Sequence, residues 1–271
     1  MTRPSHEARQ LVGCTVIITR PAGTGTALAN KVRALGGAPL LLPGLSLRAA
    51  PDTQHARTQW LQAQHDDVLI FTSPAAVRYA LALAPMQQAH GAVIAVGRAT
   101  ARALQRHGIN AQVPASRQDS EGVLALPPLQ HPRGKRVALV GAPGGRGLIQ
   151  HQLAERGARL CEVHVYRRAA SRLTRHHHGA VQQLPATACV LLSSAEALQN
   201  LQGQLPATAW ARLCQAIAVV SSERIEAAAR AAGFLRIHRA ASANQADLLM
   251  AACQAIHAYP QSRSKVSAQP S

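Results

Sequence analysis

Few side chains in this sequence are suited to acid–base chemistry, and one of them ends an alternating segment. Over residues 161–168 two valines alternate with polar side chains, the two-residue period of a strand with two different faces. Tyr166 in this segment is one of three tyrosines in the chain. Because a phenol can donate a proton or a hydrogen bond, Tyr166 is a candidate functional residue. The alternative is a tyrosine half-buried on a neighbouring strand.

Two serines follow short apolar runs that are typical of buried strands. Ser73 and Ser194 each stand where such a run gives way to a predicted helix. Neither lies in the G-x-S-x-G pattern of a serine nucleophile, so helix capping is the favoured interpretation. Ser193 with Glu196 also matches a capping box. Since a helix start carries free N–H groups, such a corner can also bind a carboxylate.

Arginines recur just after predicted strands, at Arg20, Arg98, Arg146 and Arg224. At corresponding edges of two sheets they predict an anion-binding cleft. The glycine-rich turn 141–147 has backbone N–H groups that suit an anion, but it matches neither the dinucleotide nor the P-loop pattern. We therefore predict a tight turn with anion affinity and no nucleotide site.

Histidines and cysteines do not suggest a metal. Three consecutive histidines, 176–178, point in different directions and seldom converge on one ion, so an exposed polar loop is predicted there. The five cysteines have no metal-ligand spacing and are expected to be free thiols in a reducing compartment. With no signal-peptide pattern at the start and no apolar run of membrane-spanning length, a cytoplasmic location is predicted.

The charge balance points to an anionic partner. The chain has 29 basic and 12 acidic residues, a formal net charge of +17, which favours nucleic acid or an acidic small molecule. Aromatic residues make up only 3%, so the stacking platforms of single-strand binders are nearly absent. Nucleic-acid binding is kept as a hypothesis that a mobility-shift experiment at low ionic strength can test.

The elements that carry these residues occur twice. Short apolar strands alternate with helices, which predicts parallel sheets covered on both faces. An offset of 121 residues superposes similar positions: Val16 on Val137, Leu28 on Ile149, Val32 on Leu153 and Gly36 on Gly157. The chain is therefore a divergent tandem repeat, and two α/β domains are predicted. Because ligands bind beyond the carboxyl ends of strands in such sheets, the turns there should face the site.

Several short motifs occur in an ordered series: Val16–Pro21, Ile70–Pro74, Ala95–Ala101, Ser120–Gly122, Gly144–Arg146 and Val165–Arg168. In this order and spacing the chain resembles the uroporphyrinogen-III synthase family over about residues 12 to 258. The resemblance implies an α/β fold of two flavodoxin-like parallel-sheet domains joined by a two-stranded β-ladder, with the substrate cleft between them. The implied bounds are 1–37 plus 171–258 for domain 1, 38–50 plus 160–170 for the ladder, 51–159 for domain 2 and 259–271 for a disordered tail.

The activity that the resemblance implies is cyclisation of hydroxymethylbilane, a linear tetrapyrrole with eight carboxylates. Water is lost and ring D is inverted through a spiro intermediate, a carbon–oxygen lyase reaction of haem biosynthesis that uses no cofactor or metal. The implied partners are this substrate and, transiently, the enzyme that makes it, with neither nucleic acid nor membrane, and the protein is expected to be a monomer. The alternative is a non-catalytic module of the same fold that binds a tetrapyrrole or another acidic ligand.

The resemblance also assigns site residues. Tyr166 matches the family's tyrosine proposed as the acid that assists departure of the hydroxyl, and Ser73, Thr100 and Ser194 match polar positions of the cleft. The segment Ser221–Arg224 departs from the threonine pair of many relatives, and Glu223 is expected to face away from an acidic substrate. The residues expected to bind substrate are Arg20, Ser73, Arg98, Thr100, Arg146, Ser194, Ser221 and Arg224.

Overall fold

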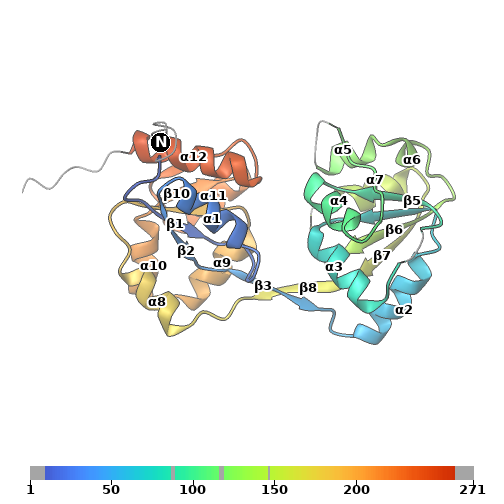
Figure 1. Cartoon of the computed structure of the whole chain (residues 1–271), viewed down its shortest axis with the longest axis horizontal. Coiled ribbons are helices and arrows are strands. Elements are labelled where there is room, and N and C mark those ends of the chain that lie inside the picture. The colour runs from blue at the N-terminus through green and yellow to red at the C-terminus, as the bar shows by residue number, and fades with distance from the viewer. Residues whose placement is uncertain (1–9, 87–88, 116–118, 146, 260–271) are drawn as a thin grey trace, which may run out of the picture. The chain divides into compact units, whose positions relative to one another are not determined.

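The computed structural model describes residues 10–86, 89–115, 119–145 and 147–259. These residues form two compact units (Figure 1). Unit 1 contains the chain as far as Ser46 and again from Ala169, and unit 2 is Leu47–Arg168. Each unit has its own parallel sheet and its own core.

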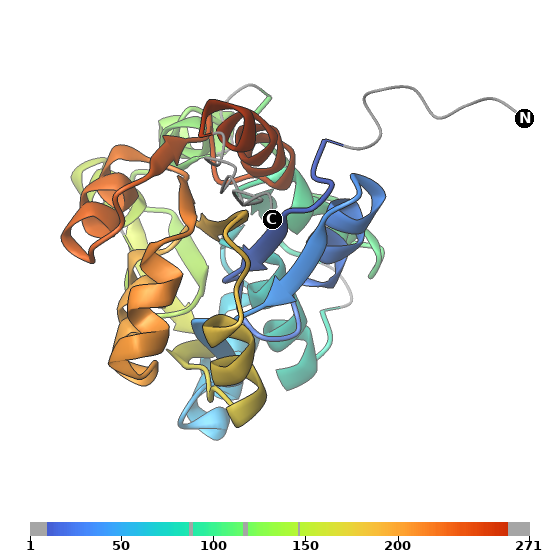
Figure 2. The same ribbon diagram turned by 90° about the vertical axis from the view of Figure 1, so that its left-hand side faces the viewer.

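Unit 1 is a five-stranded parallel sheet in the order β11-β10-β9-β1-β2. Alternate residues of its strands face opposite layers: Val16 packs with helices α1 and α12, and Ile17 with helices α8 to α11. These layers can be followed in Figure 2, where unit 1 faces the viewer. Its elements are β1 (Thr15–Ile18), α1 (Thr26–Ala34), β2 (Ala38–Leu41), α8 (Arg175–Gln182), β9 (Ala188–Leu192), α9 (Ala195–Gln204), α10 (Ala207–Cys214), β10 (Ile217–Val220), α11 (Glu223–Ala231), β11 (Ile237–Arg239) and α12 (Gln245–Ala258).

Unit 2 is a four-stranded parallel sheet in the order β5-β4-β6-β7. Phe71 packs with α2, α3 and α4, and Ile70 packs with α5, α6 and α7, so this sheet is also covered on both faces. Its elements are α2 (Thr53–Ala63), β4 (Val68–Phe71), α3 (Pro74–Leu83), β5 (Ala92–Ala95), α4 (Arg98–Gln105), α5 (Ser120–Leu124), α6 (Pro127–Gln130), β6 (Arg136–Gly141), α7 (Leu148–Glu155) and β7 (Arg159–His164).

A two-stranded sheet links the units (Figure 1). It pairs β3 (Leu45–Ala49), in which the chain passes from unit 1 to unit 2, with β8 (Tyr166–Ala170), in which it returns. The Ser46 hydroxyl donates a hydrogen bond to the Ala170 carbonyl at 3.3 Å. The two crossings predicted from the repeat are therefore hydrogen-bonded neighbours.

The predicted tandem repeat is confirmed, and the two copies exchange their first elements. At the offset of 121 residues β1 corresponds to β6, β2 to β7 and β4 to β9, so the two strand orders coincide. Each sheet thus combines a strand–helix–strand segment of one copy with the remainder of the other. The strand predicted at residues 111–113 is reduced to a single bridge between Gln112 and Ile94, in the position that β11 occupies in unit 1.

The segments predicted for the ladder, 38–50 and 160–170, are divided in the structure. Their first parts, β2 and β7, belong to the sheets of units 1 and 2, and only β3 and β8 pair across. Pro43 and Gly44 separate β2 from β3, and a Pro has no N–H for a sheet hydrogen bond. Between β7 and β8, the Val165 N–H bonds back to the carbonyls of Gly141 and Val163, at 3.0 and 3.1 Å. Of the predicted tail only Tyr259, after α12, is among the described residues.

The loop predicted at the three histidines is wrong, because they lie in helix α8. The helix begins with a capping box in which the Thr174 N–H donates to Nδ1 of His177 at 3.0 Å. Partial burial and the neighbouring His176 and His178 lower the pKa of His177. In the part of the chain that the structure describes, no three His, Cys, Asp or Glu side chains are grouped as a metal site.

Candidate active site

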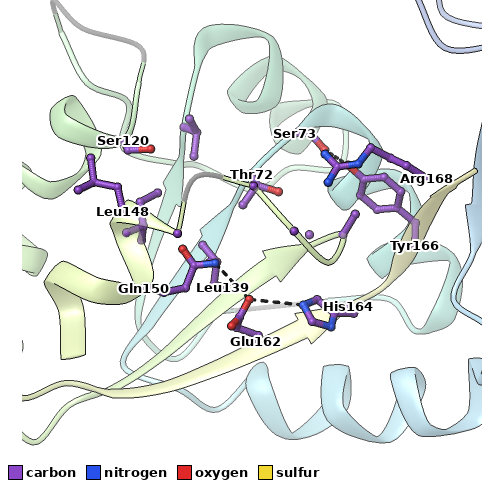
Figure 3. Close-up of a pocket in the computed structure, with 17 residues that line it drawn as sticks. Thr72, Ser73, Ser120, Leu139, Leu148, Gln150, Glu162, His164, Tyr166 and Arg168 are labelled. Atoms are coloured by element: carbon purple, nitrogen blue, oxygen red, sulfur yellow. Dashed lines mark hydrogen bonds and ion pairs between the residues drawn. The ribbon is translucent and has the colours of Figure 1, made fainter. Parts of the chain in front are cut away.

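The middle of the unit 2 sheet is a topological switch point. From β4 the chain continues to β5 at one edge, and from β6 it continues to β7 at the other. Ligands of open α/β sheets bind beyond the carboxyl ends of such neighbouring strands. Thr72 and Ser73 follow β4, Gly141 ends β6, and all three line a pocket of about 290 Å³ (Figure 3). We call it the Tyr166 pocket, after another of its lining residues.

The hydroxyl of Tyr166 is connected to the start of helix α3. It lies 3.1 Å from Oγ of Ser73, and this Oγ accepts the Ala76 N–H at 3.1 Å as the N-cap of α3. The side chain of Tyr166 is buried. Since a helix N-terminus carries partial positive charge, the phenol oxygen lies at the positive end of the α3 dipole.

The ring of Tyr166 packs against a second tyrosine, Tyr79, which belongs to helix α3. The rings of Tyr79 and Tyr166 stack with centroids 5.4 Å apart and planes inclined by 14°. Tyr79 donates its hydroxyl hydrogen to the Leu47 carbonyl of β3 at 2.8 Å. On Tyr79 lies the guanidinium of Arg78, 4.8 Å from the ring centroid. Helix α3 thus fixes both the hydroxyl and the ring of Tyr166.

We expect replacement of Tyr79 by Phe to lower the free energy of unfolding by about 1 kcal/mol, because the hydrogen bond is lost and the carbonyl of Leu47 loses its partner. Urea denaturation measures this loss. The matched control is Tyr259→Phe, whose hydroxyl donates to the Ile237 carbonyl over a longer 3.3 Å and should matter less. Equal stability of Tyr79→Phe and the wild type would show that the hydrogen bond contributes nothing.

Arg168 and the glycine turn after β6 form another wall of the pocket. Nη2 of Arg168 donates to the Pro143 carbonyl at 2.8 Å. Gly144, Gly145 and Gly147 have φ angles of 81°, 124° and 70°, which side-chain-bearing residues rarely adopt. Such a turn before helix α7 exposes backbone N–H groups that suit a carboxylate. The predicted anion ligand Arg146 in this turn lies outside the described residues.

A short polar chain lines the same pocket (Figure 3). Nε2 of Gln150 donates to Oε2 of Glu162 at 3.2 Å, and this oxygen lies 3.4 Å from Nε2 of His164. Glu162, His164, Tyr166 and Arg168 are every second residue and share one side of the segment. The sequence predicted the alternation, but Glu162 and His164 were not among the predicted site residues.

A sequence model of uroporphyrinogen-III synthase HemD matches residues 26–250 of the chain. Uroporphyrinogen-III synthase of Salmonella typhimurium is 30% identical over 249 residues, which cover 88% of this chain and 99% of that protein. The Escherichia coli enzyme is 30% identical over 251 residues, with the same two coverages. The chain belongs to the uroporphyrinogen-III synthase family. Its function is therefore that of this family in haem biosynthesis.

Solved structures of the family share the fold. A mutant uroporphyrinogen III synthase from Thermus thermophilus matches with a TM-score of 0.57 and 20% identity, covering 91% of this chain and 100% of that one. The Helicobacter pylori enzyme matches with a TM-score of 0.58 and 15% identity, covering 89% and 98%. The predicted α/β fold with two parallel sheets and a linking strand pair is confirmed. None of the described helices is both long and apolar enough to cross a membrane.

Two predicted site residues of unit 2 lie near the pocket but not in its wall. Val96, after β5, lines the pocket, whereas Arg98 and Thr100 in the first turn of α4 do not. Arg98 is exposed, and Thr100 is 3% exposed with its N–H bonded to the Gly97 carbonyl at 2.9 Å. Their roles in substrate binding stay predictions.

In unit 1, Arg20 follows β1 and is one of the four arginines that their places after predicted strands made candidate anion ligands. Nη2 of Arg20 donates to the Ala243 carbonyl at 3.1 Å. Its Nε is buried and has no hydrogen-bond partner among the described residues. Burial lowers the pKa of the guanidinium, because the charged form loses contact with water. An anion at this atom would complete its hydrogen bonding.

The other predicted residues of unit 1 follow β9 and β10 in the same sheet. Ser194 accepts the Ala197 N–H at 3.2 Å and is the N-cap of α9, which confirms the predicted cap. The capping box predicted from Ser193 is not the cap of this helix. Helix α11 is capped by Ser222 and not by Ser221. Arg224 is exposed in the first turn of α11. Binding of substrate by these residues stays a prediction.

Proposed function

We propose that this protein catalyses the cyclisation of hydroxymethylbilane to uroporphyrinogen III as a carbon–oxygen lyase. The observation that carries the proposal is the Tyr166 hydroxyl in the wall of a pocket at the switch point, hydrogen-bonded to the capped start of α3. This is a suitable place for a group that must release a proton. The family's acid tyrosine matches this residue.

In the first step Tyr166 gives its proton to the hydroxyl that leaves as water. Oγ of Ser73 accepts a hydrogen bond from the Ala76 N–H. The hydroxyl hydrogen of Ser73 is therefore available for donation to the oxygen of Tyr166. The phenolate formed on Tyr166 is then stabilised by the Ser73 hydroxyl and by the N-terminus of α3. The azafulvenium cation left on the substrate, which keeps its pyrrole N–H, is the electrophile of the cyclisation.

Binding of the carboxylates is the other requirement. A formal net charge of +17 suits a substrate with eight carboxylates. In unit 2 the backbone N–H groups of the glycine turn and the guanidinium of Arg168 offer direct contacts. We assign further carboxylates to the predicted residues Arg20, Arg98, Thr100, Arg146, Ser194, Ser221 and Arg224. The protein's main task is to hold the chain folded while its ends react.

The setting of the enzyme is also part of this proposal. The five cysteines are free thiols, as is usual in a reducing compartment, and we place the enzyme in the cytoplasm as a monomer. Hydroxymethylbilane is unstable, and we infer transient contact with the enzyme that makes it.

The test is to add the purified protein to hydroxymethylbilane as it is generated enzymatically, and to separate the uroporphyrinogen isomers. We expect the type III isomer, with the type I isomer in the reaction without protein. Formation of type I alone would contradict the proposal. Tight binding of the tetrapyrrole in that case would indicate the alternative, a binding module without turnover.

A further inference from the structure

The proposed reaction needs a base as well as an acid. The substrate loses a hydroxyl from the methylene at one end and a hydrogen from the free α-carbon of ring D at the other. Tyr166, on the proposed function, supplies the proton for the hydroxyl. A second group must take the proton that ring D releases when the last carbon–carbon bond has formed and the pyrrole regains its aromaticity.

The Tyr166 pocket contains an acidic side chain that a site for a polyanion should exclude. Glu162 is the one acidic residue among the described residues that line it. A lone carboxylate there would repel the carboxylates of the substrate. Its contacts show another use, because Oε2 lies 3.4 Å from Nε2 of His164 and accepts the amide N–H of Gln150 at 3.2 Å.

The geometry of this pair suits a base. Nε2 of His164 is shielded from solvent and makes no hydrogen bond in the part of the chain that is described. The carboxylate of Glu162 lies within ion-pair distance of this atom. This carboxylate favours the tautomer with the hydrogen on Nε2, which leaves the lone pair on Nδ1. The side chain is 43% exposed and remains accessible from the pocket.

We propose that His164, oriented by Glu162, is the catalytic base that removes the α-hydrogen of ring D. In the final closure the free α-carbon of ring D forms its bond to the methylene carbon. Its C–H bond then breaks, the electron pair returns to the pyrrole ring, and the proton goes to Nδ1 of His164. Glu162 stabilises the imidazolium, which passes its proton to water or back to Tyr166. The acid and the base thus share one side of the β7–β8 segment.

The chain offers a matched control outside the pocket. Nε2 of His151 lies 3.4 Å from Oε1 of Glu155, and Gln152 donates to this carboxylate at 2.6 Å, so the same three residue types form the same contacts on helix α7. His151 does not line the pocket. Any general effect of losing a His–Glu pair should appear equally in His151→Gln and His164→Gln.

The experiment compares wild type, His164→Gln, Glu162→Gln and His151→Gln with hydroxymethylbilane that carries hydrogen or deuterium at the free α-carbon of ring D. We expect His164→Gln to form uroporphyrinogen III ~10²-fold more slowly and to show an isotope effect larger than that of the wild type. Glu162→Gln should show a smaller change of both kinds, and His151→Gln none. In a His164→Gly variant, added imidazole should restore part of the rate.

The outcomes separate this proposal from the proposed function. A wild type that forms no type III isomer contradicts the function itself. A wild type that forms it, with His164→Gln equally fast and without an enhanced isotope effect, overturns the role of His164 alone. A slower His164→Gln with no enhanced isotope effect and no rescue of His164→Gly by imidazole would make the residue structural, which also overturns the proposal.

Discussion

Replacement of Tyr166 by Phe is expected to lower kcat/KM for uroporphyrinogen III formation by ~10²-fold, the usual loss when a general acid is removed. The phenyl ring keeps its stack on Tyr79 at 5.4 Å, so the pocket should retain its shape. What disappears is the hydroxyl that lies 3.1 Å from Oγ of Ser73. The rate should therefore fall while the unfolding midpoint changes little.

Steady-state assays with enzymatically generated hydroxymethylbilane measure this effect, with separation of the two isomers as the readout. Tyr259→Phe, at the C-cap of α12 in unit 1, is the matched control and should have the wild-type rate. An unchanged rate for Tyr166→Phe would assign Tyr166 to packing alone, and the acid would have to be sought elsewhere in the pocket.

The internal repeat shows that only one unit has a tyrosine at the position of the proposed acid. At the offset of 121 residues Ser73 corresponds to Ser194, and both cap a helix in the structure. At the same offset Tyr166 corresponds to Leu45, which is 3% exposed. A leucine can neither donate a proton nor stabilise an anion. The duplicated scaffold has thus kept both helix caps, while a phenol at this position is present in unit 2 alone.

The fold was predictable from sequence to the extent that it is local. Apolar runs, helix caps and turn glycines predicted most of the strands and helices, and the offset of 121 residues predicted the repeat. The pairing of β1 with β9 has no such signal, because an offset relates a residue to its equivalent and not to its partner in a sheet. The division of residues 161–168 at Val165 was missed for a related reason, since the alternation continues through the break.

The site was predictable residue by residue but not as an arrangement. Ser73 and Tyr166 were both candidates, yet 93 positions separate them, and their hydrogen bond depends on how α3 packs against β8. Glu162 and His164 lie on the same side of the alternating segment as Tyr166. Which side of a strand faces a pocket is decided by the sheet and the helices around it, and this information was not available from the segment itself.

Gly44 precedes the strand β3 and is expected to tolerate no side chain. A Cβ at Gly44 would lie 2.4 Å from the carbonyl oxygen of Ala197 and 2.8 Å from its Cα, in the first turn of α9. The Gly44 N–H also bonds to the Thr19 carbonyl at 3.3 Å, which fixes this part of the chain beside the end of β1. Its φ is not in the left-handed region, so the constraint is space and not backbone conformation.

Gly44→Ala should therefore lower the free energy of unfolding by about 3 kcal/mol, the upper end of the usual cost of overpacking, because backbone atoms and not a flexible side chain must move. The control is Gly179→Ala inside helix α8 of the same unit, where a Cβ meets no atom within 4 Å. That change should raise the free energy of unfolding by about 0.5 to 1 kcal/mol, since Ala is the better helix former. Urea denaturation of both variants checks the opposite signs. If Gly44→Ala matched the wild type, α9 would not lie against the crossing strand as closely as described, and the place where the chain leaves unit 1 would not be fixed by this contact.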